Sequence, residues 1–204
     1  MVLSVNWASV AVAVAAEVAP VLQPHQLYAD LNTASPQNKR KVAAIIEATG
    51  ALFVDTAVMA PVPPKGLGTP VYVSGNGAAL FAEKMSSLGM PVTVLDGVAG
   101  NAATHKLVRS IMYKGVAAVV MECLEAAEAL NLSGYARAQM MTILQDEAMI
   151  DRFVEGSKKH AGRRIHEMEA VVEMLDAIGV SAFTSQASLE KLQELSSINV
   201  QNYE

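Results

Sequence analysis

The first candidate for chemistry is a lysine that shares one stripe of a long apolar segment with two hydroxyl side chains. Lys106, Ser110 and Tyr113 are spaced at i, i+4 and i+7 within residues 98–122, so on a helix they lie on one face. A lysine beside a hydroxyl on an otherwise apolar helix, just after a glycine-rich entry, is a candidate acid/base group. Spacing alone favours a plainer interpretation, in which the Lys106 ammonium group reaches water near the helix start.

Two polar segments follow predicted strands, and the carboxyl ends of strands are where open α/β sheets bind ligands. Residues 30–36 read Asp-Leu-Asn-Thr-Ala-Ser-Pro, and Asn32 and Thr33 could contact the sugar or ring of a cofactor. Residues 55–61 read Asp-Thr-Ala-Val-Met-Ala-Pro and lead into a proline-rich loop that could line a substrate pocket. The alternatives are an ordinary strand–turn–helix cap for the first segment and a well-ordered connection for the second.

Cationic and titratable side chains gather at residues 160–169, where a helix is predicted to begin. Arg163, Arg164 and His166 lie there, although the helix dipole favours anions at an N-terminus. An anionic ligand or a carboxylate from another element would offset this misfit. The alternative, which the pattern itself favours, is a solvated face with salt bridges.

The elements that must position these residues change in kind along the chain. Short apolar runs at residues 1–5, 27–31, 51–54, 71–74 and 92–95 predict strands, and the first of them is expected to be buried. Helices are predicted between them, at residues 8–18, 36–49 and 78–87, so the sheet should be mostly parallel. After Gly100 only helices are predicted, at residues 102–130, 135–144, 147–154, 163–178 and 188–195. We therefore predict an α/β domain at residues 1–97 and an all-α domain at residues 98–204.

Composition excludes several classes of protein. The 204 residues are 52% hydrophobic and 17% charged, which is typical of a well-packed globular chain. The formal net charge of −5 argues against nucleic-acid binding. No apolar run is long enough to cross a membrane, and no Lys or Arg precedes Lys39 to form a signal peptide. The single cysteine, Cys123, is expected to be a buried thiol of a cytoplasmic protein, and no zinc spacing or P-loop predicts a metal or nucleotide site.

Taken together, these segments resemble the β-hydroxyacid dehydrogenase family, the relatives of 6-phosphogluconate dehydrogenase. The D-x-[SN]-T-x-x-P segment of that family is matched by Asp30, Asn32, Thr33 and Pro36. Its D-A-P-V-S-G-G segment is matched at Asp55 and Val58, but Met59 stands in place of the serine. Its G-x-x-G-x-x-x-x-x-K segment places the catalytic lysine at Lys106. The helical half also resembles a subgroup whose C-terminal domain is catalogued as of unknown function.

This resemblance implies a partial Rossmann-type parallel sheet followed by a helical domain like the C-terminal domain of 6-phosphogluconate dehydrogenase. It implies an NAD- or NADP-dependent oxidoreductase that moves a hydride between nicotinamide and a small hydroxy acid or related carbonyl substrate. Lys106 would exchange the hydroxyl proton, and Asn32 and Thr33 would bind the nicotinamide end of the cofactor. The substrate would be bound by Met59, Ser110, Tyr113, Arg163 and His166. The resemblance also implies a homodimer built on the helical domain.

The chain differs from the family in one large respect, because no G-x-G-x-x-G fingerprint opens a helix anywhere in it. Without that phosphate cradle, NAD or NADP is expected to bind this chain weakly or not at all. The sequence therefore leaves two interpretations open, a portion of an enzyme or a shortened, non-catalytic dimeric scaffold. Imine reductases share the same architecture, so the polar group that is reduced also stays open.

Overall fold

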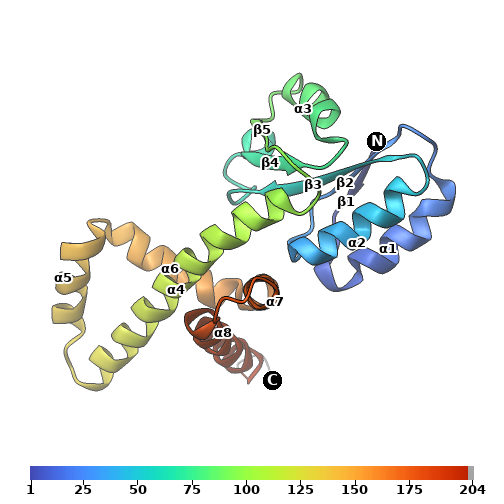
Figure 1. Cartoon of the computed structure of the whole chain (residues 1–204). Coiled ribbons are helices and arrows are strands. Elements are labelled where there is room, and N and C mark those ends of the chain that lie inside the picture. Colours follow the sequence, from blue (N-terminus) through green and yellow to red (C-terminus); the bar gives the residue numbers. More distant parts are fainter. Residues whose placement is uncertain (202–204) are drawn as a thin grey trace. The chain divides into compact units, whose positions relative to one another are not determined.

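The computed structural model describes residues 1–201, with side chains through residue 197, and it divides the chain into two compact units. The first unit, Met1–Val108, contains a five-stranded sheet with helices on both faces, and the second, Arg109–Glu204, is helical over the residues that the structure describes (Figure 1). This arrangement confirms the predicted fold class, an α/β sheet followed by helices alone. The division falls within the long helix α4, Asn101–Ala129, which begins in the first unit.

The sheet keeps the order of the strands along the chain. Its strands are β1 (Val2–Ser4), β2 (Leu27–Asp30), β3 (Leu52–Val58), β4 (Val71–Ser74) and β5 (Val92–Val94). Every neighbouring pair is parallel except β3 and β4, which run antiparallel. The prediction of a mostly parallel sheet is therefore confirmed.

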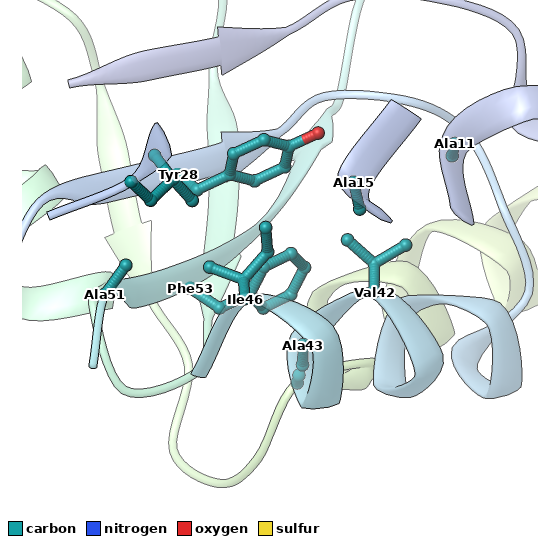
Figure 2. Packing of buried hydrophobic residues seen from close by; sticks show 10 residues of the cluster. Ala11, Ala15, Tyr28, Val42, Ala43, Ile46, Ala51 and Phe53 are labelled. Atoms are coloured by element: carbon teal, nitrogen blue, oxygen red, sulfur yellow. The ribbon is translucent and has the colours of Figure 1, made fainter. Parts of the chain in front are cut away.

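Helices cover the two faces of the sheet with separate apolar cores. On one face α1 (Ala11–Val18) and α2 (Pro36–Glu47) pack over Tyr28 and Phe53, whose rings stack across β2 and β3 (Figure 2). On the other face α3 (Ala78–Ser86) packs over Val54 and Val73. Short 3-10 turns at Ala8–Val10, Ala19–Val21 and Gly66–Gly68 complete the connections of this unit.

The start of α2 follows directly from local sequence. The Ser35 hydroxyl accepts a hydrogen bond from the Asn38 backbone N–H at 3.2 Å, and Pro36 occupies the first helical position. A hydroxyl cap followed by proline satisfies one free donor and presets the first φ angle of the helix. This short motif fixes where α2 leaves the carboxyl end of β2.

The second unit consists of helices that pack around α4. These are α5 (Ser133–Leu144), α6 (Glu147–Lys159), α7 (Ala161–Ala177) and α8 (Phe183–Gln201). Asp146 caps α6 by accepting from the Met149 backbone N–H at 3.0 Å. None of the helices in the described part of the chain is long and apolar enough to cross a membrane.

Three expectations from the sequence were wrong in detail. The first strand is not buried throughout, because it lies at a sheet edge and Leu3 is 47% exposed. Asp55 does not follow a strand but lies within β3, because pairing with β4 extends that strand to Val58. Cys123 is exposed, since it lies on a side of α4 that the rest of its unit does not cover.

Candidate active site

A row of buried polar side chains crosses the sheet in register. Ser4 pairs with Asp30, Asp30 pairs with Asp55, and Asp55 pairs with Ser74 on neighbouring strands. All four side chains are at most 5% exposed. Two carboxylates directly opposite each other in an apolar setting repel, so this row requires a compensating cation.

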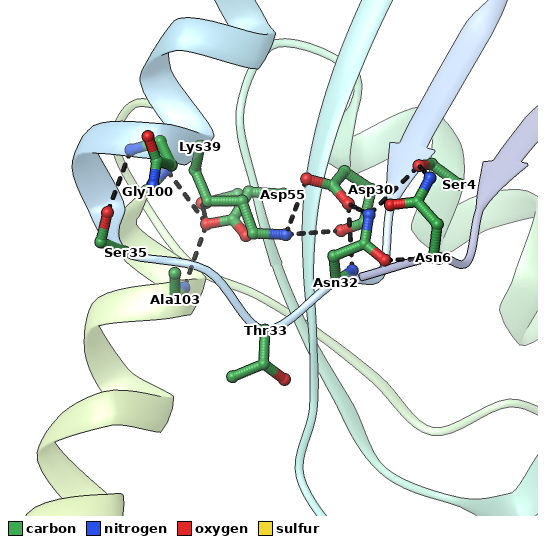
Figure 3. A network of polar contacts seen from close by, with 12 residues as sticks. Ser4, Asn6, Asp30, Asn32, Thr33, Ser35, Lys39, Asp55, Gly100 and Ala103 are labelled. Atoms are coloured by element: carbon green, nitrogen blue, oxygen red, sulfur yellow. Dashed lines mark hydrogen bonds and ion pairs between the residues drawn. The ribbon is translucent and has the colours of Figure 1, made fainter. Parts of the chain in front are cut away.

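Lys39 supplies that cation from the second turn of α2 (Figure 3). Its Nζ atom lies 3.1 Å from Asp30 Oδ2 and 3.4 Å from Asp55 Oδ1, and it donates to the Asp30 backbone carbonyl at 2.8 Å. Lys39 is only 1% exposed, and the helix dipole disfavours a cation near a helix start. The two carboxylates therefore account for its burial.

Asp55 and Ser74 together cap the start of α4. Asp55 Oδ2 accepts from the backbone N–H groups of Gly100 and Ala103, both at 3.0 Å, and from the Ser74 hydroxyl at 3.2 Å. The Ser74 hydroxyl accepts in turn from the Ala102 backbone N–H at 3.1 Å. A carboxylate from the sheet thus satisfies donors that the first turn of a helix leaves free. This fixes α4 on the sheet three residues before Lys106.

Asp30 holds the turn that follows β2. Its Oδ1 atom accepts from the Asn32 backbone N–H at 3.0 Å and from Asn32 Nδ2 at 2.5 Å. Asn32 Nδ2 also donates to the Ser4 hydroxyl at 3.2 Å, while Asn32 Oδ1 accepts from the Asn6 backbone N–H at 2.6 Å. Asn32, predicted to bind cofactor, is 5% exposed, and its amide shapes the turn that carries Thr33.

Two predicted site residues that are 73 positions apart meet in the first unit. Lys106 Nζ donates to Thr33 Oγ1 at 2.7 Å, and both side chains are partly exposed. This contact joins the predicted catalytic lysine to the predicted cofactor-binding turn. It also disfavours the interpretation that Lys106 merely extends into water.

A small cavity adjoins this pair. Its volume is about 10 Å³, close to that of one water molecule, so it is too small for an organic substrate. Its polar lining consists of Asn32, Thr33, Lys39, Asp55, Thr56 and Lys106. The Thr56 hydroxyl is buried there and has no hydrogen-bond partner within the described residues.

Met59 follows β3 and is half buried, and its backbone N–H donates to the Pro70 carbonyl at 2.9 Å. The bond closes the proline-rich loop between β3 and β4. The structure therefore places Met59 at the base of a constrained loop of the first unit, as the sequence suggested.

The remaining predicted residues lie in the helical unit, where Ser110 and Arg163 contact a buried carboxylate. Glu167 of α7 is 3% exposed and accepts a short hydrogen bond from the Ser110 hydroxyl. Lys114 Nζ lies 2.6 Å from Glu167 Oε1 and 3.3 Å from the Ser110 hydroxyl. Burial lowers the pKa of Lys114, and attraction to Glu167 opposes that shift. Ser110 is thus joined to a buried ion pair.

Tyr113 lies among three cations. The charged groups of Arg109, Lys114 and Arg164 are 5.8, 5.5 and 5.7 Å from the centre of its ring. Arg164 is 6% exposed and donates to the Ser157 hydroxyl at 2.5 Å. Of the cationic side chains that the sequence placed at the start of α7, Arg164 is thus buried, and burial lowers its pKa.

Arg163 and His166 are exposed on α7. Arg163 Nη1 lies 3.8 Å from Glu167 Oε2, and His166 Nδ1 lies 2.9 Å from Glu169 Oε2. Both contacts fit the alternative of a solvated, salt-bridged face, and their predicted substrate contacts stay predictions.

Sequence reasoning missed Lys39 and Lys114 as members of these clusters. A signal for Lys39 was available, because it is a cation near a helix start, as Arg163 is. Lys114 is one turn beyond Ser110, so it extends the Lys106 stripe, but only the fold supplies Glu167 as its partner. No group of three potential metal-ligating side chains occurs among the described residues.

The helical unit also contains a broad apolar groove between α4, α5 and the start of α8. Its volume is about 780 Å³, and the residues that line it include Met112, Val119, Cys123, Tyr135 and Ile143. Met112 and Ile143 are 75% and 80% exposed. Such a contiguous apolar surface is typical of an interaction site.

The sheet, its helices and the long helix that leads into a helical unit define a Rossmann-like class of two-domain protein. A family model described as a domain of unknown function, DUF1932, matches residues 127–195. A solved conserved hypothetical protein from Sinorhizobium meliloti 1021 is 31% identical, with a TM-score of 0.76, over 94% of this chain and 65% of its own. An uncharacterized 28.5 kDa protein from Methanothermus fervidus is 29% identical over 149 residues, which are 70% of this chain and 55% of that protein.

A second solved protein links this class to a named family. It is described as a conserved protein of unknown function with structural similarity to 3-hydroxyacid dehydrogenases, and it is 28% identical with a TM-score of 0.77. The match covers 98% of this chain and 76% of that one. A Mycobacterium tuberculosis 3-hydroxyisobutyrate dehydrogenase shares the fold at 16% identity, with a TM-score of 0.76 over 95% of this chain and 72% of its own. The chain is therefore similar to proteins that resemble 3-hydroxyacid dehydrogenases, and part of its helical unit matches the DUF1932 model. It spans 55–65% of the length of its first relatives.

Proposed function

We propose that the protein is a cytoplasmic, NAD- or NADP-dependent oxidoreductase that acts on a small hydroxy acid or a related carbonyl compound. The observation that carries the proposal is the 2.7 Å hydrogen bond from Lys106 Nζ to Thr33 Oγ1. It supports a reaction centre at which the acid/base group lies beside the cofactor-binding turn.

The turn after β2 fits the nicotinamide end of the cofactor, because it lies at the carboxyl end of a parallel strand, where α/β sheets bind such rings. When bound, the cofactor would accept or return the hydride. Lys106 would take the proton of the substrate hydroxyl during oxidation and return it during reduction. Thr33 would orient the Lys106 amine, and Asn32 would hold the turn in shape. The same fold occurs in a protein solved with NADP+.

The substrate side is proposed to consist of Met59, Ser110, Tyr113, Arg163 and His166, of which Met59 is the most informative. A thioether is only a weak acceptor and cannot donate to a carboxylate. We therefore propose a substrate with an apolar group near Met59, or one whose acid group is bound by Arg163 or His166. Reduction of an imine is the alternative within this class, since a reductive aminase shares the fold.

A second candidate function is a non-catalytic dimeric scaffold, and the apolar groove of the helical unit favours assembly of some kind. We propose that a second copy of the chain covers this groove, whether or not the protein is an enzyme. The groove is mostly apolar, as homodimer interfaces are.

The test is an assay of the protein expressed from its complete reading frame, with NADH, NADPH and their oxidised forms. Small hydroxy acids and ketone–amine mixtures should be offered in parallel, and turnover read from the absorbance of the reduced nicotinamide. Turnover that Lys106→Met abolishes supports the proposed dehydrogenase or imine reductase. A folded dimer without turnover on any of these substrates would favour the scaffold.

A further inference from the structure

Lys39 is a buried titratable residue to which the proposed reaction gives no role. It is 1% exposed, and it lies against two carboxylates that belong to neighbouring strands. Asp30 and Asp55 are opposite each other in the register of β2 and β3, so without a cation their charges would repel at close range. Lys39 therefore determines whether these two side chains can stay together.

Each carboxylate holds a different partner of the Lys106–Thr33 hydrogen bond. Asp30 binds the backbone and side chain of Asn32, the residue immediately before Thr33. Asp55 binds the backbone N–H of Ala103, three residues before Lys106 on α4. Figure 3 shows Lys39 between these two halves, with Asp30 and Asn32 on one side and Asp55 and Ala103 on the other.

We propose that Lys39 is a positioning residue for Lys106. By pairing with both carboxylates, it fixes the spacing between the Thr33 turn and the start of α4, and so the geometry of the Lys106–Thr33 contact. The significance of this geometry for catalysis rests on the proposed function. The geometric claim itself can be tested without any activity.

The test measures how fast an amine-reactive ester modifies Lys106 in the folded chain, read by peptide mass spectrometry. Exposed Lys65 and Lys84 serve as internal references. In Lys39→Met, modification of Lys106 should accelerate at least about fivefold, equivalent to roughly 1 kcal/mol of lost protection. The references should not change. Lys41→Met is the matched control, because Lys41 is exposed two residues further along α2.

Amide hydrogen exchange separates loss of positioning from general loosening. A positioning role predicts that exchange at Ala102 and Ala103 accelerates clearly more than exchange at Val54 and Val73 in the central strands, where only the lower global stability acts. Equal acceleration at all four residues would indicate a merely structural role and would overturn the proposal. Unchanged modification of Lys106 in a folded Lys39→Met chain would also overturn it.

Asp30→Asn decides the matter if Lys39→Met does not fold. This variant keeps a side-chain oxygen that can accept from Asn32, and it leaves Lys39 paired with Asp55. The network therefore loses one ion pair, and no buried charge is left without a partner. It should accelerate modification of Lys106 as well, and an unchanged rate would refute the positioning role. If the complete protein shows no turnover but both variants expose Lys106, the proposed function fails and the positioning role stands.

Discussion

Lys106 and Thr33 form a hydrogen bond of 2.7 Å although they are 73 residues apart in the chain. Both residues are positioned by nearby residues that are anchored to the sheet. Thr33 is held through the Asn32–Asp30 contact, and Lys106 through the capping of α4 by Asp55. The contact therefore reports whether the first unit has assembled correctly.

The first prediction concerns Lys106→Met, which keeps the aliphatic stem and removes the amine. In the complete protein the chemical step should slow by roughly 10²–10⁴, the usual effect of removing a positioned acid/base group. Folding should be nearly unchanged, because the side chain is partly exposed. Lys84→Met, at an exposed site, is the control in steady-state kinetics. A raised Michaelis constant with an unchanged turnover number would indicate a binding role instead.

The second prediction concerns the stability of the first unit. Lys39→Met leaves Asp30 and Asp55 buried without their cation, which should lower the free energy of unfolding by about 3–5 kcal/mol. Urea denaturation measures this loss. Lys41→Met should stay within about 0.5 kcal/mol of the parent, as exposed substitutions usually do. Equal effects of the two variants would contradict the role of the buried network.

The third prediction concerns pH. Because the pKa of Lys114 is lowered in the fold from its ordinary value of 10.5, the unfolded chain binds a proton that the folded chain releases. Stability contributed by this residue should therefore rise as pH increases through the alkaline range below 10.5. Thermal unfolding of the parent should be compared with Lys114→Met/Glu167→Gln, which removes both charges. The rise in stability with pH should be absent from the double variant. An identical pH profile for the parent and the double variant would show that the fold does not lower the pKa of Lys114.

The fourth prediction concerns assembly. Ile143 is 80% exposed in the apolar groove, so Ile143→Glu should place a charge in the proposed dimer interface and shift the protein toward monomers. Light scattering over a range of concentrations gives the oligomeric state. Val21→Glu alters an equally apolar residue that is 72% exposed in the first unit, and it should leave the dimer intact. A monomeric parent protein at high concentration would refute the dimer.

The fifth prediction concerns substrate choice. Met59→Ser supplies a hydroxyl donor where the parent has a thioether, and it should improve turnover of hydroxyisobutyrate-like acids relative to less polar substrates. A hydrogen bond to a charged group corresponds to about tenfold or more in the ratio of kcat/KM values. The measurement is a competition between two substrates. If hydroxyisobutyrate were already the best substrate of the parent, the inference from Met59 would be wrong.

Much of the architecture was determined by local sequence. Ser35 and Pro36 fix the start of α2, because a cap and a preset φ angle act within one turn. The run of helix-forming residues after residue 100, which has no Gly or Pro before Gly115, predicts α4. The resemblance at Asn32, Thr33 and Lys106 selected residues that the fold brings into one region of the first unit. These features depend on residues that are close in sequence or share a motif.

Only the tertiary structure decided which charged groups meet. Asp30, Lys39 and Asp55 become partners through the pairing of β2 with β3 and the packing of α2, neither of which leaves a periodic signal in the sequence. Glu167 becomes the partner of Lys114 in the same way, across 53 residues. Cys123 is exposed because the groove on α4 is not covered within its own unit. Burial and charge pairing between distant segments depend on strand register and helix packing, so local sequence patterns cannot determine them.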